Sequence, residues 1–163
     1  MVILKCTLRL LRRLRVQGTV ESQDSTTVLG SWYANDFVVA RRPYVICTSE
    51  RSKLSVVVPF KESVTLPDRF RVRLRFLLEN IGIPMPLIEK EMHEMNVLEF
   101  GRAQSRAVLG NMKQLTFFAK DWMQEYPEVD LKKLDLLLSD HLVGPEPYIF
   151  PQESTIQLFR GVA

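Results

Sequence analysis

The stretch from Leu29 to Phe60 limits the possible folds more than any other part of the sequence. It contains three runs of apolar, β-branched and aromatic residues, which are Trp32–Ala40, Tyr44–Ser49 and Leu54–Phe60. A connector that contains a proline and a second, charged connector separate these runs. Runs of this length between turn-forming residues predict three antiparallel strands that follow one another in chain order as a meander.

Two polar residues interrupt the first of these runs. Asn35 and Asp36 are poor strand formers, and they follow directly on a run that begins with two aromatic residues. Such an interruption predicts a bulge, an edge position or a functional site. The sequence therefore indicates a candidate cleft at this strand, formed by Trp32, Tyr33, Asn35 and Asp36.

Outside this stretch the periodicity is mostly helical. Val2–Thr7 is predicted to be a strand, and Thr7 is a candidate N-cap for a short helix over Leu8–Arg15. Residues 65–82 fit both a strand and a helix, but Thr65 as a cap and Gly82 as a stop favour the helix. Further helices are predicted over residues 84–96, 105–126 and 129–143, with a short strand over residues 97–100.

Two details of the C-terminal half depend on glycine and proline. Gly110 lies inside the predicted helix over residues 105–126, where a glycine suggests close packing or a local break. The tail after residue 143 begins with several prolines, so it is predicted to lie across the surface, with Thr155–Phe159 as a candidate edge strand.

Together these elements predict an α+β fold. Its antiparallel sheet is built on the three-strand meander, and about four helices pack against the sheet. With 163 residues, of which 46% are apolar and 25% charged, the chain is expected to form a single domain over residues 1–163.

The cysteines and the apolar runs indicate the compartment. Cys6 and Cys47 both lie in apolar runs, where a free cysteine is a small buried hydrophobe, so we expect reduced thiols and a cytoplasmic protein. No apolar run is long enough to span a membrane. Met1–Val20 has five basic and no acidic residues, which leaves a transit peptide as an alternative to the predicted first strand.

Charge is distributed unevenly along the chain. Residues 1–80 carry fourteen Lys and Arg against seven Asp and Glu, whereas residues 121–163 carry three against eight. This asymmetry would steer an acidic partner to one side of the molecule, or the two halves would complement each other after folding.

Two groups of basic residues are candidates for anion binding. Arg41 and Arg42 lie in the first turn of the meander, although basic turns also protect strand ends from aggregation. The free N–H groups at a helix start capped by Ser105 form a second candidate, which an acidic residue of the same chain would equally fill. The predicted anion- or nucleic-acid-binding residues are Arg41, Arg42, Arg102, Ser105, Arg106 and Lys113.

Recognisable catalytic motifs are absent. The sequence contains no P-loop, GxGxxG, GxSxG or HExxH motif. Glu89 and His93 are four residues apart on a predicted helix, but a zinc site needs three or four ligands and the sequence suggests no third. We therefore expect neither a metal nor a cofactor.

Three segments together resemble a known family. The segments LGSWYAN, RRPYVICTSERSKLSVVVP and SRAVLGNMK are similar to motifs of small uncharacterised bacterial proteins, a domain of unknown function with WYAN-type and SVLGxMN-type motifs. Asn111 and Lys113 depart from that pattern, in which Ser and Asn occupy these positions. The resemblance spans nearly the whole chain, and it implies a bacterial cytoplasmic setting but no mechanism.

The sequence leaves two classes of function open. The first is a non-enzymatic module that binds an acidic partner, either nucleic acid or protein, in a bacterial toxin–antitoxin or defence-related system. The second is a metal-independent nuclease or transferase, with a site between the Trp32–Asp36 strand and the Ser105–Arg106 helix start. Exposed aromatic residues of the C-terminal half also suggest a homo-oligomer, and no membrane partner is expected.

Overall fold

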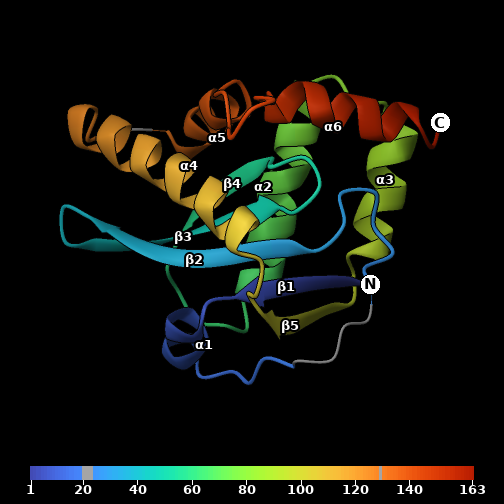
Figure 1. The fold of residues 1–163 in the computed structure, drawn as a ribbon. Coiled ribbons are helices and arrows are strands. Elements are labelled where there is room, and N and C mark those ends of the chain that lie inside the picture. The colour runs from blue at the N-terminus through green and yellow to red at the C-terminus, as the bar shows by residue number, and fades with distance from the viewer. Residues whose placement is uncertain (20–23, 129) are drawn as a thin grey trace.

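The protein has an α+β fold in which helices cover both faces of one five-stranded sheet (Figure 1). The computed structural model describes residues 1–19, 24–128 and 130–163. The strands lie in the order β4-β3-β2-β1-β5. Their bounds are β1 Val2–Cys6, β2 Trp32–Val39, β3 Arg42–Ser49, β4 Ser55–Pro59 and β5 Leu98–Arg102.

The sheet is mixed, so the prediction of an antiparallel sheet is wrong for two of its strands. β2, β3 and β4 pair antiparallel, whereas β1 is parallel both to β2 and to β5. Parallel neighbours need long connections, and the segments before β2 and before β5 both contain helices. Because β1 lies inside the sheet, between β2 and β5, the N-terminal segment is an integral part of the fold.

The described residues form six helices, where about four were predicted. Their bounds are α1 Leu8–Leu14, α2 Leu66–Asn80, α3 Met85–Glu94, α4 Arg106–Glu125, α5 Leu131–Ser139 and α6 Pro151–Arg160. α6 corrects the prediction of an irregular tail with an edge strand. Pro151 occupies the first turn of this helix, where a proline is tolerated, and Thr155 and Phe159 are buried one turn apart.

Local capping follows the sequence in most places. The hydroxyl of Thr7 accepts a hydrogen bond from the backbone N–H of Leu10 at 3.3 Å, as predicted for a cap. Gly82, with φ of 89°, follows the end of α2. Thr65 does not cap α2, because its backbone is already helical and its side chain bonds to Glu62 instead.

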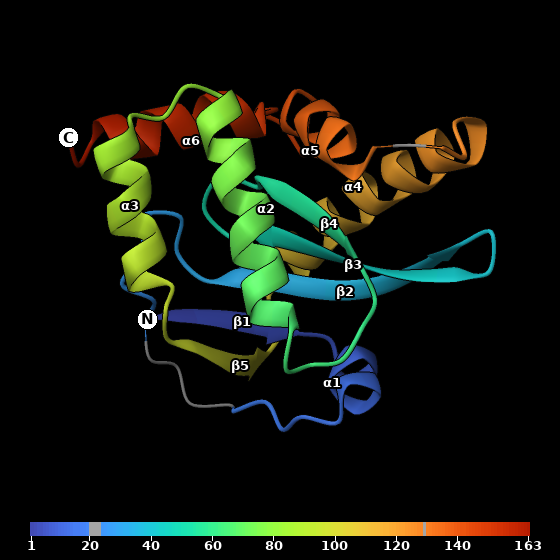
Figure 2. The same cartoon turned by 180° about the vertical axis from the view of Figure 1, so that it is seen from behind.

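Two apolar layers enclose the sheet. α2 and α3 cover one face of the sheet (Figure 2). Trp32 and Ala34 of β2 belong to the apolar layer on this face, and the Trp32 ring meets Phe70 edge to face with the ring centroids 4.9 Å apart. Tyr33 and Phe37 point the other way, toward α4 and α5. The alternation along β2 therefore assigns each side chain to one of the two faces.

Both outer edges of the sheet are covered in part. At β4, the Asp135 carboxylate of α5 accepts the backbone N–H of Val57 at 2.9 Å, and Arg73 of α2 pairs with the same carboxylate at 2.6 Å. At β5, the backbone N–H of Thr19 donates to Phe100 O at 3.1 Å. The polar composition of Gln17–Thr27 also predicts a loop, and residues 20–23 of this segment lie outside the described residues.

Within the described ranges, no helix has the length and apolarity that crossing a bilayer requires.

Candidate functional site

β2 is longer than its parallel neighbour, and this difference creates the site. The β1–β2 register runs from Leu4 opposite Trp32 to Cys6 opposite Ala34, after which the chain turns away from the sheet into α1. Asn35–Val39 therefore have no strand beside them on that side. The β2–β3 pairing continues through these residues without a bulge, so the polar interruption marks an edge position.

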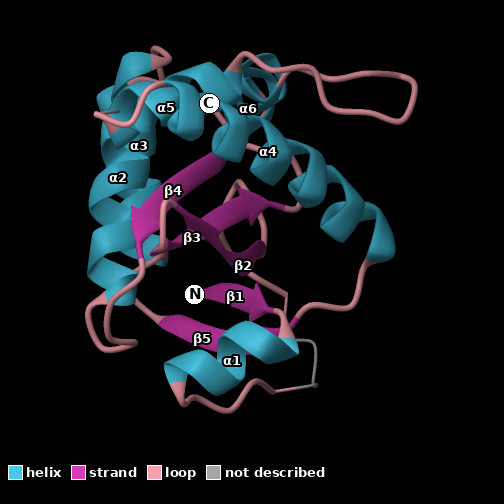
Figure 3. Cartoon of the chain, turned by 90° about the vertical axis from the view of Figure 1, so that its left-hand side faces the viewer, coloured by secondary structure: helices cyan, strands magenta, loops and turns pink. Residues whose placement is uncertain are grey.

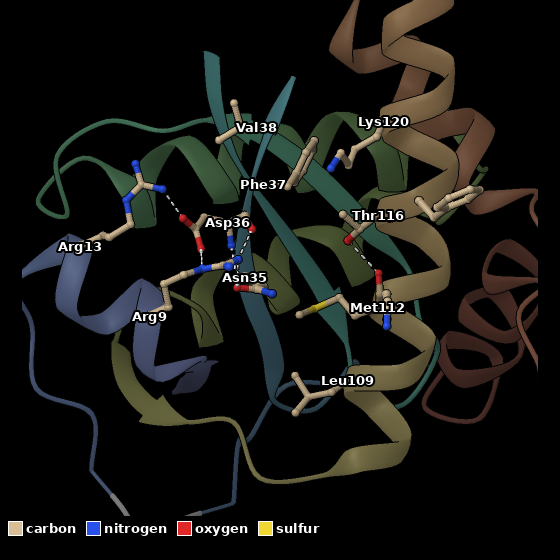
Figure 4. Close-up of a pocket in the computed structure, with 12 residues that line it drawn as sticks. Arg9, Arg13, Asn35, Asp36, Phe37, Val38, Leu109, Met112, Thr116 and Lys120 are labelled. Carbon is tan, nitrogen blue, oxygen red and sulfur yellow. Dashed lines mark hydrogen bonds and ion pairs between the residues drawn. The ribbon is translucent and has the colours of Figure 1, made fainter. Parts of the chain in front are cut away.

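A cleft of about 590 Å³ occupies the space beside this edge (Figure 4). We call it the β2–α4 cleft, because β2 and α4 supply most of its lining and α1 closes one side. Figure 3 shows α1 and α4 on opposite sides of the strands. The lining residues are Arg9, Arg13, Asn35, Asp36, Phe37, Val38, Leu109, Met112, Lys113, Thr116, Phe117 and Lys120.

The α1 side of the cleft is held together by a buried carboxylate. Asp36 is only 4% exposed, and its Oδ1 accepts a hydrogen bond from Arg9 Nε at 2.9 Å. Arg9 also donates to the backbone carbonyl of Asp36 at 2.8 Å, and Arg13 pairs with the second carboxylate oxygen. The Arg13 guanidinium also lies over the Phe60 ring at 4.7 Å. These contacts fix two cations at the edge of β2.

Asn35 presents a hydrogen-bond donor to the cleft. Its Oδ1 accepts from the Thr7 hydroxyl at 2.8 Å and from the backbone N–H of Asp36 at 2.9 Å. The amide nitrogen of Asn35 points away from these donors, toward Met112 across the cleft (Figure 4). This nitrogen makes no hydrogen bond to any residue that the structure describes, so it is available to an acceptor on a ligand.

The α4 side combines apolar and basic side chains. Leu109, Met112 and Phe117 line it, and Phe117 is 78% exposed. Lys113 and Lys120 lie seven residues apart on the same side of the helix, and both line the cleft. Four cationic side chains line the cleft, two on each side, and Asp36 supplies the single carboxylate of the lining. The cleft therefore has an excess of positive charge, which suits an anionic ligand with apolar parts.

The predicted strand and helix start do converge, but mainly through a structural contact. Tyr33 Oη accepts a hydrogen bond from the backbone N–H of Ser105 at 3.2 Å, and the Ser105 hydroxyl caps α4 by accepting from Val108 N. Of the four predicted cleft residues, Asn35 and Asp36 line the cleft. Tyr33 is buried between the strand and α4, and Trp32 faces the opposite side of the sheet.

The predicted anion-binding residues are spread along and beyond the cleft. Lys113 lines it. Arg41 and Arg42 are exposed at the tip of the β2–β3 hairpin, and Arg102 and Arg106 are exposed near the start of α4. The backbone N–H and the hydroxyl of Ser105 are both bonded within the chain, so this residue does not present a free anion site.

Sequence reasoning missed three of the four cations of the cleft. Arg9 and Arg13 are one helical turn apart, a spacing that places both on one face of α1. Lys113 and Lys120 are two turns apart, so they also share one face of α4. That spacing was the available signal. The burial of Asp36 between the arginines depends on how α1 packs against β2, which the sequence does not show.

Other titratable groups do not form a site. Glu89 pairs with Arg75, and the described residues contain no cluster of three or more metal-ligating side chains. Cys6 and Cys47 are buried free thiols, as predicted. Burial raises the pKa of the Cys6 thiol to about 12, so this thiol is protonated and unreactive at neutral pH.

Comparison with known sequences identifies a family to which the chain is similar. The profile of a protein family described as "Domain of unknown function (DUF6933)" matches residues 3–154. A search of curated proteins finds no match to this chain. The matched range includes the five strands except for Val2, the first residue of β1, and it includes every residue that lines the β2–α4 cleft.

Proposed function

This chain belongs to the family described as a domain of unknown function (DUF6933), and we propose that it is a non-enzymatic binding module that holds an acidic partner in the β2–α4 cleft. The observation that carries this proposal is the charge of the cleft. Arg9, Arg13, Lys113 and Lys120 line it together with the single carboxylate of Asp36. An acidic ligand would meet a net attraction on both sides of the cleft.

The arginine pair can serve both the fold and a ligand. The side chain of Arg9 is 65% exposed and that of Arg13 is 39% exposed, although both bond to the buried Asp36. A guanidinium has five N–H donors, so each arginine keeps donors for an incoming anion. The contact with Asp36 orders the two side chains before binding, which lowers the entropic cost of holding a ligand.

Basic residues outside the cleft would extend the attraction. Arg12 is exposed on α1, Arg15 at its C-cap, and Arg41 and Arg42 at the hairpin tip. They would raise the rate of association more than the affinity, because exposed charges act mainly by steering. A bacterial toxin–antitoxin or defence-related system would supply an acidic partner of this kind.

The alternative, a metal-independent nuclease or transferase, has no specific observation in its favour. Both carboxylate oxygens of Asp36 are bonded to arginines, and the Ser105 hydroxyl is bonded to a backbone N–H. Tyr33 Oη accepts from Ser105 N and is buried. These groups serve the fold, whereas acid–base catalysis needs them in reach of a substrate.

The test is a binding titration with two polyanionic probes, a fluorescein-labelled single-stranded oligonucleotide and a fluorescein-labelled poly-glutamate peptide. We expect at least one probe to bind at low salt and to dissociate steeply as salt is added, because ion pairs are screened. The double variant Lys113→Glu/Lys120→Glu should weaken this binding by about tenfold or more.

The matched control is Lys90→Glu/Lys133→Glu. These lysines are exposed on α3 and α5 and lie outside the cleft. Because two lysines are again replaced by glutamate, the control variant has the same net charge as the cleft variant. The control should bind within about threefold of the wild type. Absence of binding by both probes, or equal loss in both variants, would refute the proposed function.

A further inference from the structure

The free edge of β2 has backbone groups that point into the cleft. Ala34 O accepts from Thr7 N at 3.1 Å and Asp36 O accepts from Arg9, so alternate residues of β2 turn their polar groups toward this side. The same alternation turns Val38 N–H and C=O toward the cleft.

The partner of Val38 in β3 supports this assignment. Val38 stands opposite Pro43, which has no N–H, and Pro43 O accepts from Phe60 N at 3.0 Å on its other side. Val38 N–H and C=O therefore take no part in the ladder with β3. No residue that the structure describes bonds to them, and Val38 is 48% exposed. This is an unpaired strand edge, the kind of surface to which another strand can pair.

At Asp36, side chains take the place of a neighbouring strand. The Asn35 side chain accepts the Asp36 N–H, and Arg9 donates to the Asp36 carbonyl. Arg9 is a long and mostly exposed side chain, so it can leave this carbonyl to an incoming backbone N–H while it keeps its contact with the carboxylate. The edge is thus protected in the free protein and can pair over Asp36–Val38 when a partner arrives.

The two faces beside this edge have different chemistry. Phe37 points toward α4, where Leu109, Met112 and Phe117 line the cleft. Asp36 points to the opposite face, where it meets Arg9 and Arg13. Successive side chains of a strand placed beside β2 would point to these two faces in turn. The chemistry therefore fits a strand in which apolar and acidic residues alternate.

We propose that the β2–α4 cleft takes an extended peptide segment of a partner protein, with alternating acidic and apolar residues, which adds as a strand to the edge of β2 at Asp36–Val38. This inference rests on the proposed function and names its partner class. The peptide backbone supplies the N–H and C=O groups that the edge requires, and its side chains match both faces. A nucleic acid has the negative charge but cannot supply these backbone groups.

The first experiment measures binding of a fluorescein-labelled ten-residue peptide of alternating Glu and Val by anisotropy. Two further peptides have the same sequence and charge, one N-methylated at every Val and the other at every Glu. In a strand the N–H groups of alternate residues face the same side. One methylated peptide should therefore lose about tenfold or more in affinity, and the other should stay within about threefold of the parent peptide.

The second experiment changes the protein. Val38→Pro removes the N–H of this edge that no described residue accepts, without breaking the β2–β3 ladder, and proline is tolerated at a strand edge. Val38→Ala keeps this N–H and shortens the side chain, so it is the matched control. We expect the proline variant to bind the parent peptide about five- to tenfold more weakly, and the alanine variant to bind within about threefold.

The outcomes separate this inference from the proposed function. If the oligonucleotide binds and the peptide does not, the strand-addition inference fails and the proposed function stands. Equal binding of the two methylated peptides would also overturn the inference, whatever the fold of the proline variant. If neither polyanion nor the alternating peptide binds, both proposals fail.

Discussion

The hydroxyl of Tyr33 accepts a hydrogen bond from the backbone N–H of Ser105 at 3.2 Å, which joins the start of β2 to the start of α4. This bond connects residues 72 positions apart in the sequence. It also connects two elements that form opposite sides of the cleft, because the lining residues Asn35–Val38 follow Tyr33 in β2 and those between Leu109 and Lys120 follow Ser105 in α4. The position of α4 over the edge of β2 therefore depends in part on one buried hydroxyl.

Tyr33→Phe should destabilise the protein. Removing the hydroxyl leaves Ser105 N–H without its acceptor in a partly buried place, and we expect the free energy of unfolding in urea to fall by about 1 kcal/mol. Tyr44→Phe is the control, since the Tyr44 hydroxyl bonds to no residue within the described ranges and its ring keeps its stacking on Phe37. Equal decreases in the free energy of unfolding of the two variants would show that the Tyr33 hydrogen bond does not stabilise the fold.

Asp36→Asn should affect stability and binding in opposite directions. The variant weakens the bonds from Arg9 and Arg13, so we expect the free energy of unfolding to fall by about 1–2 kcal/mol. The cleft also loses its only carboxylate, and affinity for the poly-glutamate or oligonucleotide probe should rise several-fold. Chemical unfolding and anisotropy measure the two effects. A variant that binds the probe more weakly than the wild type would show that the ordering of Arg9 and Arg13 by Asp36 outweighs the loss of its negative charge.

Gly110→Ala should stabilise the protein. α4 continues through this position, and a Cβ added here would meet no atom within 4 Å, so the expectation of close packing or a break at this glycine is wrong. An exposed helical glycine costs roughly 0.5–1 kcal/mol relative to alanine, mainly through the entropy of the unfolded chain. Thermal or urea unfolding should show this gain. No change, or a loss, would mean that the glycine is needed for a contact outside the single chain.

Asp135 should make stability depend on pH. Burial raises the pKa of its carboxyl from the ordinary value of 3.8 to about 7, against the opposing effects of the Arg73 ion pair and the Val57 N–H. Between these values the folded chain keeps a proton that the unfolded chain releases, so this group's contribution to stability is full below pH 4 and is lost as the pH rises to about 7.

Asp135→Asn tests this dependence, because asparagine does not titrate and still offers Val57 an acceptor oxygen. Between pH 4 and 7 the free energy of unfolding of the variant should rise relative to that of the wild type by at most about 1.4 kcal/mol per pH unit. Urea unfolding of both proteins at several pH values gives the comparison. If the free energy of unfolding of the wild type instead rises relative to that of the variant over this range, the effect of the Arg73 ion pair on the Asp135 pKa outweighs the effect of burial.

Much of the local structure could be predicted from the sequence. The strands of the Leu29–Phe60 stretch, the caps at Thr7 and Ser105 and the end of α2 near Gly82 all follow from short-range patterns. Propensity, capping and periodicity act over a few residues, so they are visible in a single chain. α6 is not predicted because the prolines at the start of the tail argue against a helix, although the fixed φ of Pro151 suits a first turn.

The sequence by itself determined most of the strands and helices, although not α6, and it marked Asn35–Asp36 as an irregularity. Only the tertiary structure decided that β1 pairs parallel and ends at Cys6, which leaves the β2 edge open, and that α1 turns Arg9 and Arg13 onto Asp36. Strand order and helix docking result from long-range burial, in which many apolar residues contribute small and interchangeable amounts. No local sequence pattern specifies the total of these contributions, and the cleft forms only because the strands and helices pack in this way.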